Sequence, residues 1–200
     1  MVLMAIVGRL GEGKTLALTY FILRNYWKGR KIYSNYHLNK IPYIYVSNPE
    51  DIENMNEGFF AGDEIWTWAD SRLSGSHKNK FITSVLSKSR KRGINITYTC
   101  QYFKSVDIRM RTVTDFIAIP SLNASESICR VSVYSVPDYT LQQVFKFRTA
   151  PVFPLYDTKE EVKELHYEKP MPEKKEKEIE KPDGIKIRRK PKEKPVSYED

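Results

Sequence analysis

The chain has 200 residues, two cysteines (Cys100 and Cys129) and a formal net charge of +8 at pH 7. This length suits one domain with a hydrophobic core, and cysteines without metal-ligand spacing argue against a disulfide framework or a zinc site. No apolar run reaches the roughly 18 to 20 residues of a membrane-spanning helix. The first apolar run begins at residue 2, which leaves no room for a signal peptide. We therefore expect an intracellular protein with no integral membrane segment.

The positive charge is concentrated in the first 157 residues. Residues 158–200 contain 13 Lys and Arg against 12 Asp and Glu, whereas residues 1–157 contain 20 against 13. The segment 158–200 is also rich in proline and poor in apolar residues, so we predict a folded domain over 1–157 and a largely disordered tail over 158–200. The basic excess of the folded part favours a polyanionic partner, although a solvated basic surface would have the same composition.

The first predicted elements are a strand over 2–7 and a helix over 15–27, with the sequence GRLGEGKT between them. Its spacing fits G-x-x-x-x-G-K-[ST], the P-loop pattern, in the strand–turn–helix context that the motif requires. Glycines let backbone N–H groups approach phosphate oxygens, and the helix N-terminus adds partial positive charge. We expect Lys14 to contact the β- and γ-phosphates and Thr15 to hold Mg²⁺. The predicted nucleotide-binding residues are Gly8, Arg9, Leu10, Gly11, Glu12, Gly13, Lys14 and Thr15.

The next predicted elements are two strands, the start of a helix and a third strand, at 31–36, at 42–46, near 47 and at 58–62. The third strand ends in Asp63 and Glu64. In P-loop NTPases an acid at the end of a strand beside the P-loop strand assists Mg²⁺ binding, and a second acid can deprotonate the attacking water. We therefore assign Asp63 to the metal, together with Thr15, and Glu64 to catalysis. A pair of exposed acids at a strand end is the alternative.

Beyond a polar loop over 69–80, the predicted elements are a helix near 80–90, a strand over 94–99 and a short helix near 104–111. The strand closes on Gln101, which we expect to sense the γ-phosphate or position water; a surface glutamine is the alternative. Two arginine clusters flank this strand. Either could supply an arginine finger in trans, which stabilises charge on the transferred phosphoryl group, or could grip DNA phosphates. The candidate arginines are Arg90, Arg92, Arg109 and Arg111.

The last predicted strands cover 115–119, 127–136 and 142–149, and the final two alternate as a hairpin. Strands that alternate with helices in the first part of the chain indicate a parallel sheet flanked by helices. The fold class that we expect is α/β, a P-loop NTPase of the RecA/ASCE-like kind. Its sheet is mostly parallel, with appended antiparallel strands and a disordered C-terminal tail.

Five stretches resemble, in this order, the FtsK/HerA superfamily of P-loop motor ATPases: GRLGEGKT, FFAGDE, SKSRKRGINITYTCQ, VDIRMRTVTDF and FPLYDTKEE. The likeness covers roughly residues 1–158 and is greatest to small viral genome-packaging ATPases and to the ATPase domain of zonula occludens toxin-like phage assembly proteins. The resemblance implies a ring, a hexamer or a pentamer, that threads double-stranded DNA through its centre by hydrolysing ATP with Mg²⁺. It also implies a metal acid at Asp63, a catalytic acid at Glu64, a sensor at Gln101 and an arginine finger among the four candidate arginines.

The resemblance is compatible with more than one function. Toxin-like assembly proteins of filamentous phages usually carry a membrane span, and this chain contains no such run, which favours packaging into a capsid over extrusion through a membrane. We therefore predict an ATP-hydrolysing DNA translocase of a viral packaging motor, in the host-cell cytoplasm or associated with the virion, with a capsid or portal protein as a partner. A toxin-like assembly ATPase, a P-loop small-molecule kinase and a nucleotide switch are the alternatives.

Overall fold

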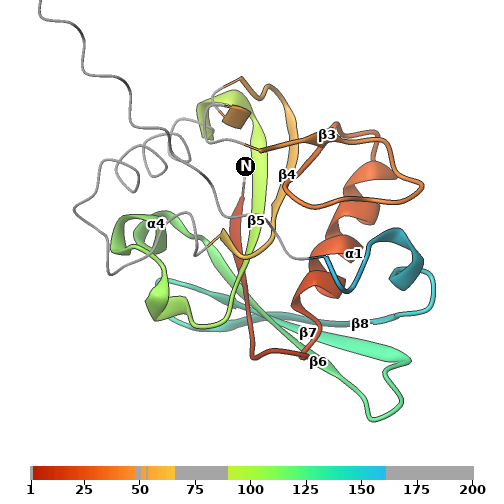
Figure 1. The fold of residues 1–200 in the computed structure, drawn as a ribbon. Coiled ribbons are helices and arrows are strands. Elements are labelled where there is room, and N and C mark those ends of the chain that lie inside the picture. Colours follow the sequence, from red (N-terminus) through yellow and green to blue (C-terminus); the bar gives the residue numbers. More distant parts are fainter. Residues whose placement is uncertain (1, 48–50, 53, 66–89, 161–200) are drawn as a thin grey trace, which may run out of the picture. The chain divides into compact units, whose positions relative to one another are not determined.

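The computed structural model describes residues 2–47, 51–52, 54–65 and 90–160. Within this part of the chain, the strands form one sheet in the order β3–β2–β4–β5–β1–β6–β7–β8 (Figure 1). The strands are β1 (Leu3–Val7), β2 (Ile32–Ser34), β3 (Ile44–Tyr45), β4 (Gly58–Gly62), β5 (Ile94–Cys100), β6 (Phe116–Leu122), β7 (Ile128–Ser135) and β8 (Leu141–Arg148). The helical segments include α1 (Lys14–Tyr26), α4 (Ile108–Val113) and the 3-10 turns η3 (Arg90–Arg92), η4 (Phe103–Ser105) and η5 (Phe153–Leu155).

Neighbouring strands from β3 to β6 are parallel, and only the pairs β6–β7 and β7–β8 are antiparallel. β1 lies between β5 and β6, and Leu3 to Ile6 are buried, as expected of a short apolar strand that is covered on both faces. Parallel strands all end at the same edge of a sheet. The segments that follow β1, β4 and β5 therefore come together at that edge, where ligands bind in open α/β sheets.

Two groups of buried side chains cover the two faces of the sheet. α1 lies on one face, where Leu18 and Ile22 pack with Ile6 of β1. α4 lies on the other face (Figure 1), where Met110 packs with Tyr98 of β5. The strands between the two helices are buried from both sides, which explains why they read as nearly continuous apolar runs.

The antiparallel strands β6, β7 and β8 extend the sheet beyond the P-loop strand. β6 joins the two parts, because it pairs in parallel with β1 and antiparallel with β7. Cys129 and Val131 of β7 are buried on the α1 face, and the rings of Tyr20 and Phe147 stack with centroids 4.0 Å apart. α1 is therefore packed against both the parallel part and the extension.

The expected α/β fold, with a mostly parallel sheet and appended antiparallel strands, is confirmed. The expected elements differ from the observed ones mainly at their ends, and the helix expected near 104–111 is the turn η4 followed by α4. The predicted loop over 69–80 and the helix near 80–90 lie outside the described residues, apart from residue 90, as does the tail beyond residue 160. The domain boundary at residue 157 stays a prediction. No helix of the described residues is long and apolar enough to cross a membrane.

Candidate active site

The P-loop wraps the N-terminus of α1 at the carboxyl end of β1. Gly11 and Gly13 have φ angles of 81° and 84°, in the left-handed region that glycine adopts at little cost. A Cβ atom on Gly13 would also lie 3.3 Å from the Leu122 side chain. The Lys14 ammonium donates to the Arg9 carbonyl oxygen at 3.0 Å, and the Lys14 side chain is buried. A buried cation and a helix N-terminus therefore meet where phosphate is expected to bind.

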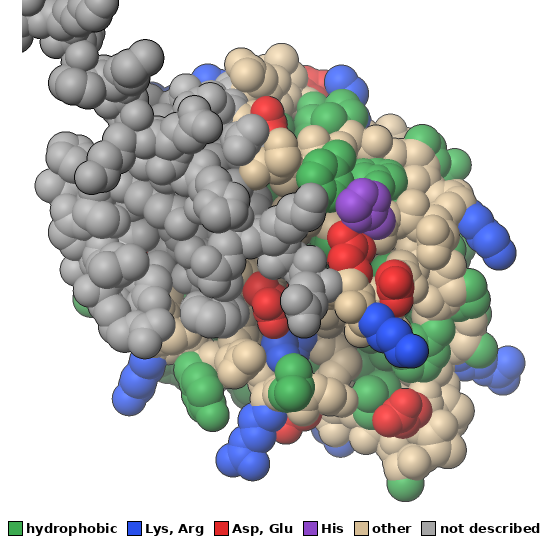
Figure 2. All heavy atoms as spheres, in the orientation of Figure 1, with side chains coloured by type: hydrophobic (Ala, Val, Ile, Leu, Met, Phe, Trp, Pro, Cys, Tyr) green, Lys and Arg blue, Asp and Glu red, His purple; other side chains and the backbone are tan. Residues whose placement is uncertain are grey.

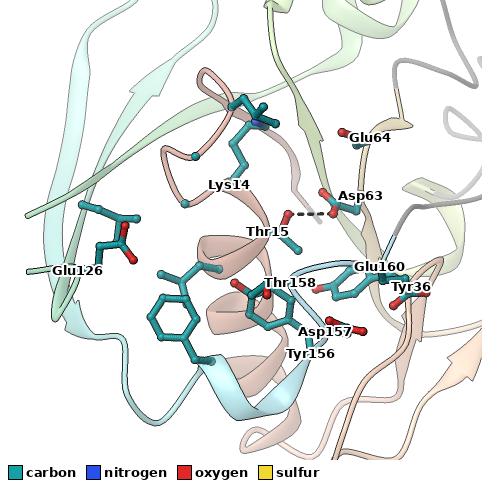
Figure 3. Close-up of a pocket in the computed structure, with 16 residues that line it drawn as sticks. Lys14, Thr15, Tyr36, Asp63, Glu64, Glu126, Tyr156, Asp157, Thr158 and Glu160 are labelled. Carbon is teal, nitrogen blue, oxygen red and sulfur yellow. Dashed lines mark hydrogen bonds between the residues drawn. The ribbon is translucent and has the colours of Figure 1, made fainter.

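Asp63 connects the end of β4 to the P-loop. Its Oδ2 atom accepts a hydrogen bond from the Thr15 hydroxyl at 2.9 Å (Figure 3), and its Oδ1 atom accepts one from the Thr99 hydroxyl at 2.5 Å. Hydroxyl and carboxylate oxygens are the hard ligands that Mg²⁺ prefers, usually together with phosphate oxygens and water. The oxygen atoms of Thr15 and Asp63 therefore fit a magnesium ion bound next to a phosphate.

The position of β4 in the sheet corrects one expectation. We expected the strand that ends in Asp63 to lie beside the P-loop strand, and this is wrong: β5 lies between β4 and β1. A crossover in a parallel sheet can skip a position, so the order of strands along the chain does not fix their order in the sheet. The Asp63 carboxylate reaches Thr15 across the end of β5, and it also accepts a hydrogen bond from Thr99 of β5.

The Asp63 backbone and carboxylate are both held from several sides. The Asn35 side chain accepts the Asp63 N–H at 2.7 Å and donates to the Asp63 carbonyl oxygen at 2.8 Å. Burial raises the pKa of the Asp63 carboxyl, while the hydrogen bonds from Thr99 and Thr15 and the charge of Lys14 act in the opposite direction. A buried carboxylate in a fixed position favours a nearby cation, because the cation offsets the loss of hydration.

Glu64 follows Asp63 in an unusual backbone conformation. Its φ angle is 48°, in a region that non-glycine residues seldom occupy. The Glu64 N–H donates to the Thr99 hydroxyl at 2.7 Å, so Thr99 contacts both acids of the pair. Figure 3 shows Glu64 next to Asp63 at the end of the same strand. Sparsely populated backbone conformations cluster at functional sites, where the surrounding contacts enforce them.

A cavity of about 720 Å³ lies against the P-loop and these two acids. Its far side is formed by the segment that follows β8, residues 152–160, which we term the C-terminal strap. Figure 3 shows Tyr156, Asp157, Thr158 and Glu160 of the strap facing the start of α1. The volume is in the range of pockets that hold ligands of nucleotide size.

The C-terminal strap is fastened to the segment after β2. Leu38 forms an antiparallel bridge with Tyr156, and the Asn39 N–H donates to the Leu155 carbonyl oxygen at 2.7 Å. The Glu160 carboxylate accepts the His37 N–H at 2.9 Å and lies 2.6 Å from His37 Nδ1. The strap is therefore held against the segment after β2 at its middle and at Glu160.

The charge of the cavity wall is strongly asymmetric. Among the described residues that line it, Lys14 is the one cation, and the carboxyl groups belong to Asp63, Glu64, Glu126, Asp157 and Glu160. Figure 2 shows several acidic side chains near the middle of this face of the molecule, with a few basic ones beside them and others at its margin. A triphosphate bound here would need positive charge beyond that of Lys14.

The predicted P-loop residues divide into two groups. The members that line the cavity are Leu10, Gly11, Gly13, Lys14 and Thr15. Gly8, Arg9 and Glu12 do not line it; instead the Glu12 carboxylate accepts the Arg9 N–H at 2.6 Å. These residues support the loop conformation rather than face the cavity.

Gln101 occupies the place that the sequence predicts, although it does not line the cavity. It follows β5, which pairs with β1, so it lies at the tip of the strand next to the P-loop. Arg109 and Arg111 are on α4, where the Arg109 N–H donates to the Asp107 carboxylate at 2.9 Å and Arg111 Nε donates to the Val106 carbonyl oxygen at 3.0 Å. Neither arginine lines the cavity.

Arg90 and Arg92 lie at the other edge of the sheet. They form η3, which precedes β5, whereas the P-loop lies where the parallel strands end. Among the residues whose side chains the structure describes, Arg92, Arg109 and Arg111 do not line the cavity of their own chain. A finger role for any of them stays a prediction, and it requires a neighbouring chain.

The sequence interpretation missed the supporting residues of the site. Thr99 and Asn35, which hold Asp63, carry no motif of their own, and the only signal for Thr99 is a hydroxyl two residues before Gln101 in an apolar strand. The stretch FPLYDTKEE contributed to the family resemblance, but no site residue was assigned to it. It contains most of the C-terminal strap.

The structure is similar to several solved structures, while no family model and no curated protein sequence matches the chain. The N-terminal domain of zonular occludens toxin from Neisseria meningitidis aligns with a TM-score of 0.54 and 18% identity, over 78% of this chain and 100% of that one. The genome-packaging NTPase B204 of Sulfolobus turreted icosahedral virus 2, in complex with ATP-gammaS, aligns with a TM-score of 0.52 and 12% identity, over 72% and 96%. The DNA-packaging ATPase B204 of Sulfolobus turreted icosahedral virus aligns with a TM-score of 0.51 and 14% identity, over 70% and 95%.

These alignments define the class of fold, which is that of the P-loop ATPases. The expected structural likeness to zonula occludens toxin-like domains and to viral packaging ATPases is confirmed. At identities of 12% to 18% the likeness establishes the fold; the activity has to be argued from the site.

Proposed function

We propose that the chain is a Mg²⁺-dependent ATP hydrolase that moves double-stranded DNA as part of a viral genome-packaging motor. The observation that carries the hydrolase is the hydrogen-bonded group of Thr15, Asp63 and Thr99, which joins the P-loop to the acidic end of β4. A glycine turn alone would have no reason to be coupled to a buried carboxylate two strands away.

The predicted site residues have distinct roles in the proposal. Lys14 and the backbone N–H groups at the start of α1 hold the β- and γ-phosphates, and Thr15 and Asp63 hold the metal. A bound Mg²⁺ would neutralise phosphate charge and orient the γ-phosphate. The Glu64 carboxylate accepts a proton from the attacking water, and Gln101 senses the γ-phosphate from the end of β5.

The acidic wall of the cavity supports a multi-chain arrangement. Lys14 is the one cation among the described residues that line the cavity, so an arginine from a neighbouring chain would add positive charge to a wall whose described part is mostly acidic. We infer a ring, a hexamer or a pentamer, in which Arg90, Arg92, Arg109 or Arg111 serves as that finger. An arginine supplied in trans can accelerate phosphoryl transfer by about 10³- to 10⁵-fold.

DNA is proposed as the substrate that is moved because of the charge of the chain and because of its structural neighbours. Residues 1–157 carry 20 basic against 13 acidic residues, which suits a polyanionic partner. Two of the similar structures are named as genome- or DNA-packaging enzymes. The same reasoning leads us to propose a capsid or portal protein as a further partner, and the host-cell cytoplasm or the virion as the location.

The experiment that tests this proposal is phosphate release from ATP by the full chain, with and without double-stranded DNA. We expect hydrolysis that depends on Mg²⁺ and rises with DNA, and its loss in Lys14→Ala and Glu64→Gln. Glu57→Gln is a matched control for the second variant, because Glu57 precedes β4 at the opposite edge of the sheet.

The pattern of results separates the alternatives. Hydrolysis that is indifferent to DNA would overturn the motor, and a phosphorylated small-molecule acceptor would identify a kinase. Nucleotide binding without turnover would point to a switch. Retention of full activity in Glu64→Gln would remove Glu64 from the catalytic role.

A further inference from the structure

The antiparallel extension of the sheet has one covered face and one exposed face. Its covered face packs on α1 through Cys129, Val131 and Phe147. Side chains alternate between the faces of a strand, and the register places residues of one face opposite each other. The exposed face, which we term the basic sheet face, consists of Ile119, Ser121, Ile128, Arg130, Ser132, Val144, Lys146 and Arg148.

The basic sheet face carries three cations that no acid of these strands balances. β6, β7 and β8, whose residues the structure describes throughout, contain no Asp or Glu. Arg130 lies directly opposite Lys146 in the antiparallel register, so their Cβ atoms are roughly 5 Å apart. Arg148 is two residues from Lys146 on the same strand, a rise of about 7 Å. All three side chains are exposed.

This arrangement is unfavourable in the free chain. Like charges that lie directly opposite each other on a sheet destabilise it, and here the sequence places two cations in such a pair. A closely spaced row of negative charges across β7 and β8 would remove the repulsion. The phosphates of a nucleic acid form such a row.

We propose that the basic sheet face binds the phosphate backbone of double-stranded DNA. Arg130, Lys146 and Arg148 contact phosphates, and the hydroxyls of Ser121 and Ser132 can donate to phosphate oxygens as well. The inference rests on the proposed function and adds the surface on which the DNA lies.

A second basic cluster provides the natural comparison. Arg30, Lys31, Lys91 and Arg92 line a cavity of about 950 Å³ at the edge of the sheet where β2, β4 and β5 begin. Glu57 lines the same cavity, and the Arg30 guanidinium donates to the Asn25 side chain at 3.0 Å. Part of its charge is therefore balanced or engaged by described neighbours, whereas β6, β7 and β8 contain no acid beside the three cations of the basic sheet face.

Two triple variants of the full chain test the proposal, and each removes three positive charges. The first is Arg130→Gln/Lys146→Gln/Arg148→Gln, and the comparison is Arg30→Gln/Lys31→Gln/Lys91→Gln. Binding to a short DNA duplex without nucleotide is measured by fluorescence anisotropy over a series of salt concentrations. We expect the first variant alone to weaken binding. The slope of log K against the logarithm of the salt concentration should become less negative by about 0.9 for each phosphate that the variant no longer neutralises, roughly 2 to 3 in total.

Other results have definite meanings. Equal weakening in both variants would show a diffuse electrostatic effect and overturn the inference, as would weakening in the comparison variant alone. Unchanged DNA binding with a changed sedimentation coefficient in the first variant would assign the face to a contact between copies of the chain. If the unchanged chain binds no DNA, with or without an ATP analogue, the DNA part of the proposed function fails too.

A charge-preserving variant distinguishes the loss of positive charge from a loss of folded structure. Arg130→Lys/Arg148→Lys keeps the three cations, so it should bind DNA within about twofold of the unchanged chain and keep the full salt dependence. Thermal unfolding of the triple variant should show no decrease in Tm, because the substitutions remove like-charge repulsion from an exposed face. A lower Tm together with weak binding by the charge-preserving variant would overturn the inference.

Discussion

Thr99 connects the two acids of the candidate site through a single hydroxyl group. It donates to the Asp63 carboxylate and accepts the Glu64 N–H, while its own side chain is fully buried. Without this hydroxyl, Asp63 would keep only one of its two side-chain partners, and the Glu64 N–H would have no acceptor in Thr99. We therefore regard Thr99 as a positioning residue.

Substitution of this threonine gives a sharp prediction at the residue scale. In Thr99→Val the shape is kept and the hydroxyl is removed, so we expect the free energy of unfolding to fall by about 1 to 3 kcal/mol. We also expect kcat to fall by about ten- to a hundredfold, because the two acids are no longer aligned with each other. Denaturant unfolding and steady-state ATPase kinetics measure the two effects.

Two variants of the same strand serve as controls. Thr99→Ser keeps the hydroxyl and should restore most of kcat. Thr97→Val changes a buried threonine two residues away on the same face of β5, and it should leave kcat within about twofold. An equal decrease of kcat in Thr97→Val and Thr99→Val would show that the effect is general to β5.

Substitution of two glycines can separate the stability cost of a strained backbone from an effect on nucleotide binding. Gly13 and Gly29 both have left-handed φ angles, but only Gly13 has a neighbour, Leu122, within reach of an added Cβ. Each alanine variant should cost about 1 to 2 kcal/mol of stability, measured by denaturant unfolding. Only Gly13→Ala should weaken binding of a fluorescent ATP analogue, since Gly13 lines the cavity. Weakened binding in Gly29→Ala as well would contradict this assignment.

At the scale of elements, the C-terminal strap links the end of β8 to the cavity. Its last contact is that between His37 and Glu160, and the Glu160 side chain also lines the cavity. The stacked rings of His37 and Tyr45, with centroids 4.9 Å apart, extend this contact to β3. Movement of the strap would therefore change the cavity wall without any change in the P-loop.

Weakening this contact should alter nucleotide exchange more than stability. In Glu160→Gln the charge is removed, so we expect faster release of a fluorescent nucleotide in stopped-flow measurements, by about threefold or more. The free energy of unfolding should change by less than about 1 kcal/mol, since partly exposed pairs contribute little. His37→Ala should have the same effect, and a double variant no larger in effect than the single ones would confirm that both act through one contact. Unchanged release in both single variants would contradict a closing role of the strap.

The elements that the sequence predicts well are those with strong local signals. The P-loop lies between β1 and α1 as expected, because glycine spacing, an apolar strand and a helix start coincide within a short stretch. The position of β4 was predicted wrongly, because sheet order depends on crossovers between distant segments. Asn35 and Thr99 can form hydrogen bonds with Asp63 only when β2, β4 and β5 are aligned in the sheet, and no local sequence pattern predicts this alignment.

At the scale of the whole molecule, one cysteine lies in each of the two layers of the core. Cys100 belongs to the buried group on the α4 face and Cys129 to the group on the α1 face. Burial raises the pKa of the Cys100 thiol to about 12 and that of the Cys129 thiol to about 11. Only thiolates react readily, so both cysteines should be inert in the native protein at neutral pH.

Alkylation kinetics should therefore measure unfolding of both layers. At mildly alkaline pH we expect Cys100 and Cys129 to react with iodoacetamide at one common rate that is set by unfolding. Mass spectrometry of quenched samples measures this rate, and the denatured chain gives the upper limit. Because unfolded thiols ionise at lower pH than the buried ones, rising pH should also lower stability. Rapid reaction of one cysteine alone would show that its layer opens independently.

The place of β1 in the sheet has a consequence for synthesis of the chain on the ribosome. β1 and α1 emerge before the strands on either side of β1, which are β5 and β6, and the N–H of Leu3 donates to the side chain of a residue 112 positions later. Until residue 148 has emerged, the apolar face of α1 has no complete sheet to cover it. Long-range pairing of this kind is slow and exposes apolar surface in the meantime. The nascent chain should therefore be a target for chaperones that bind early, and its nucleotide site can form only after most of the domain has been translated.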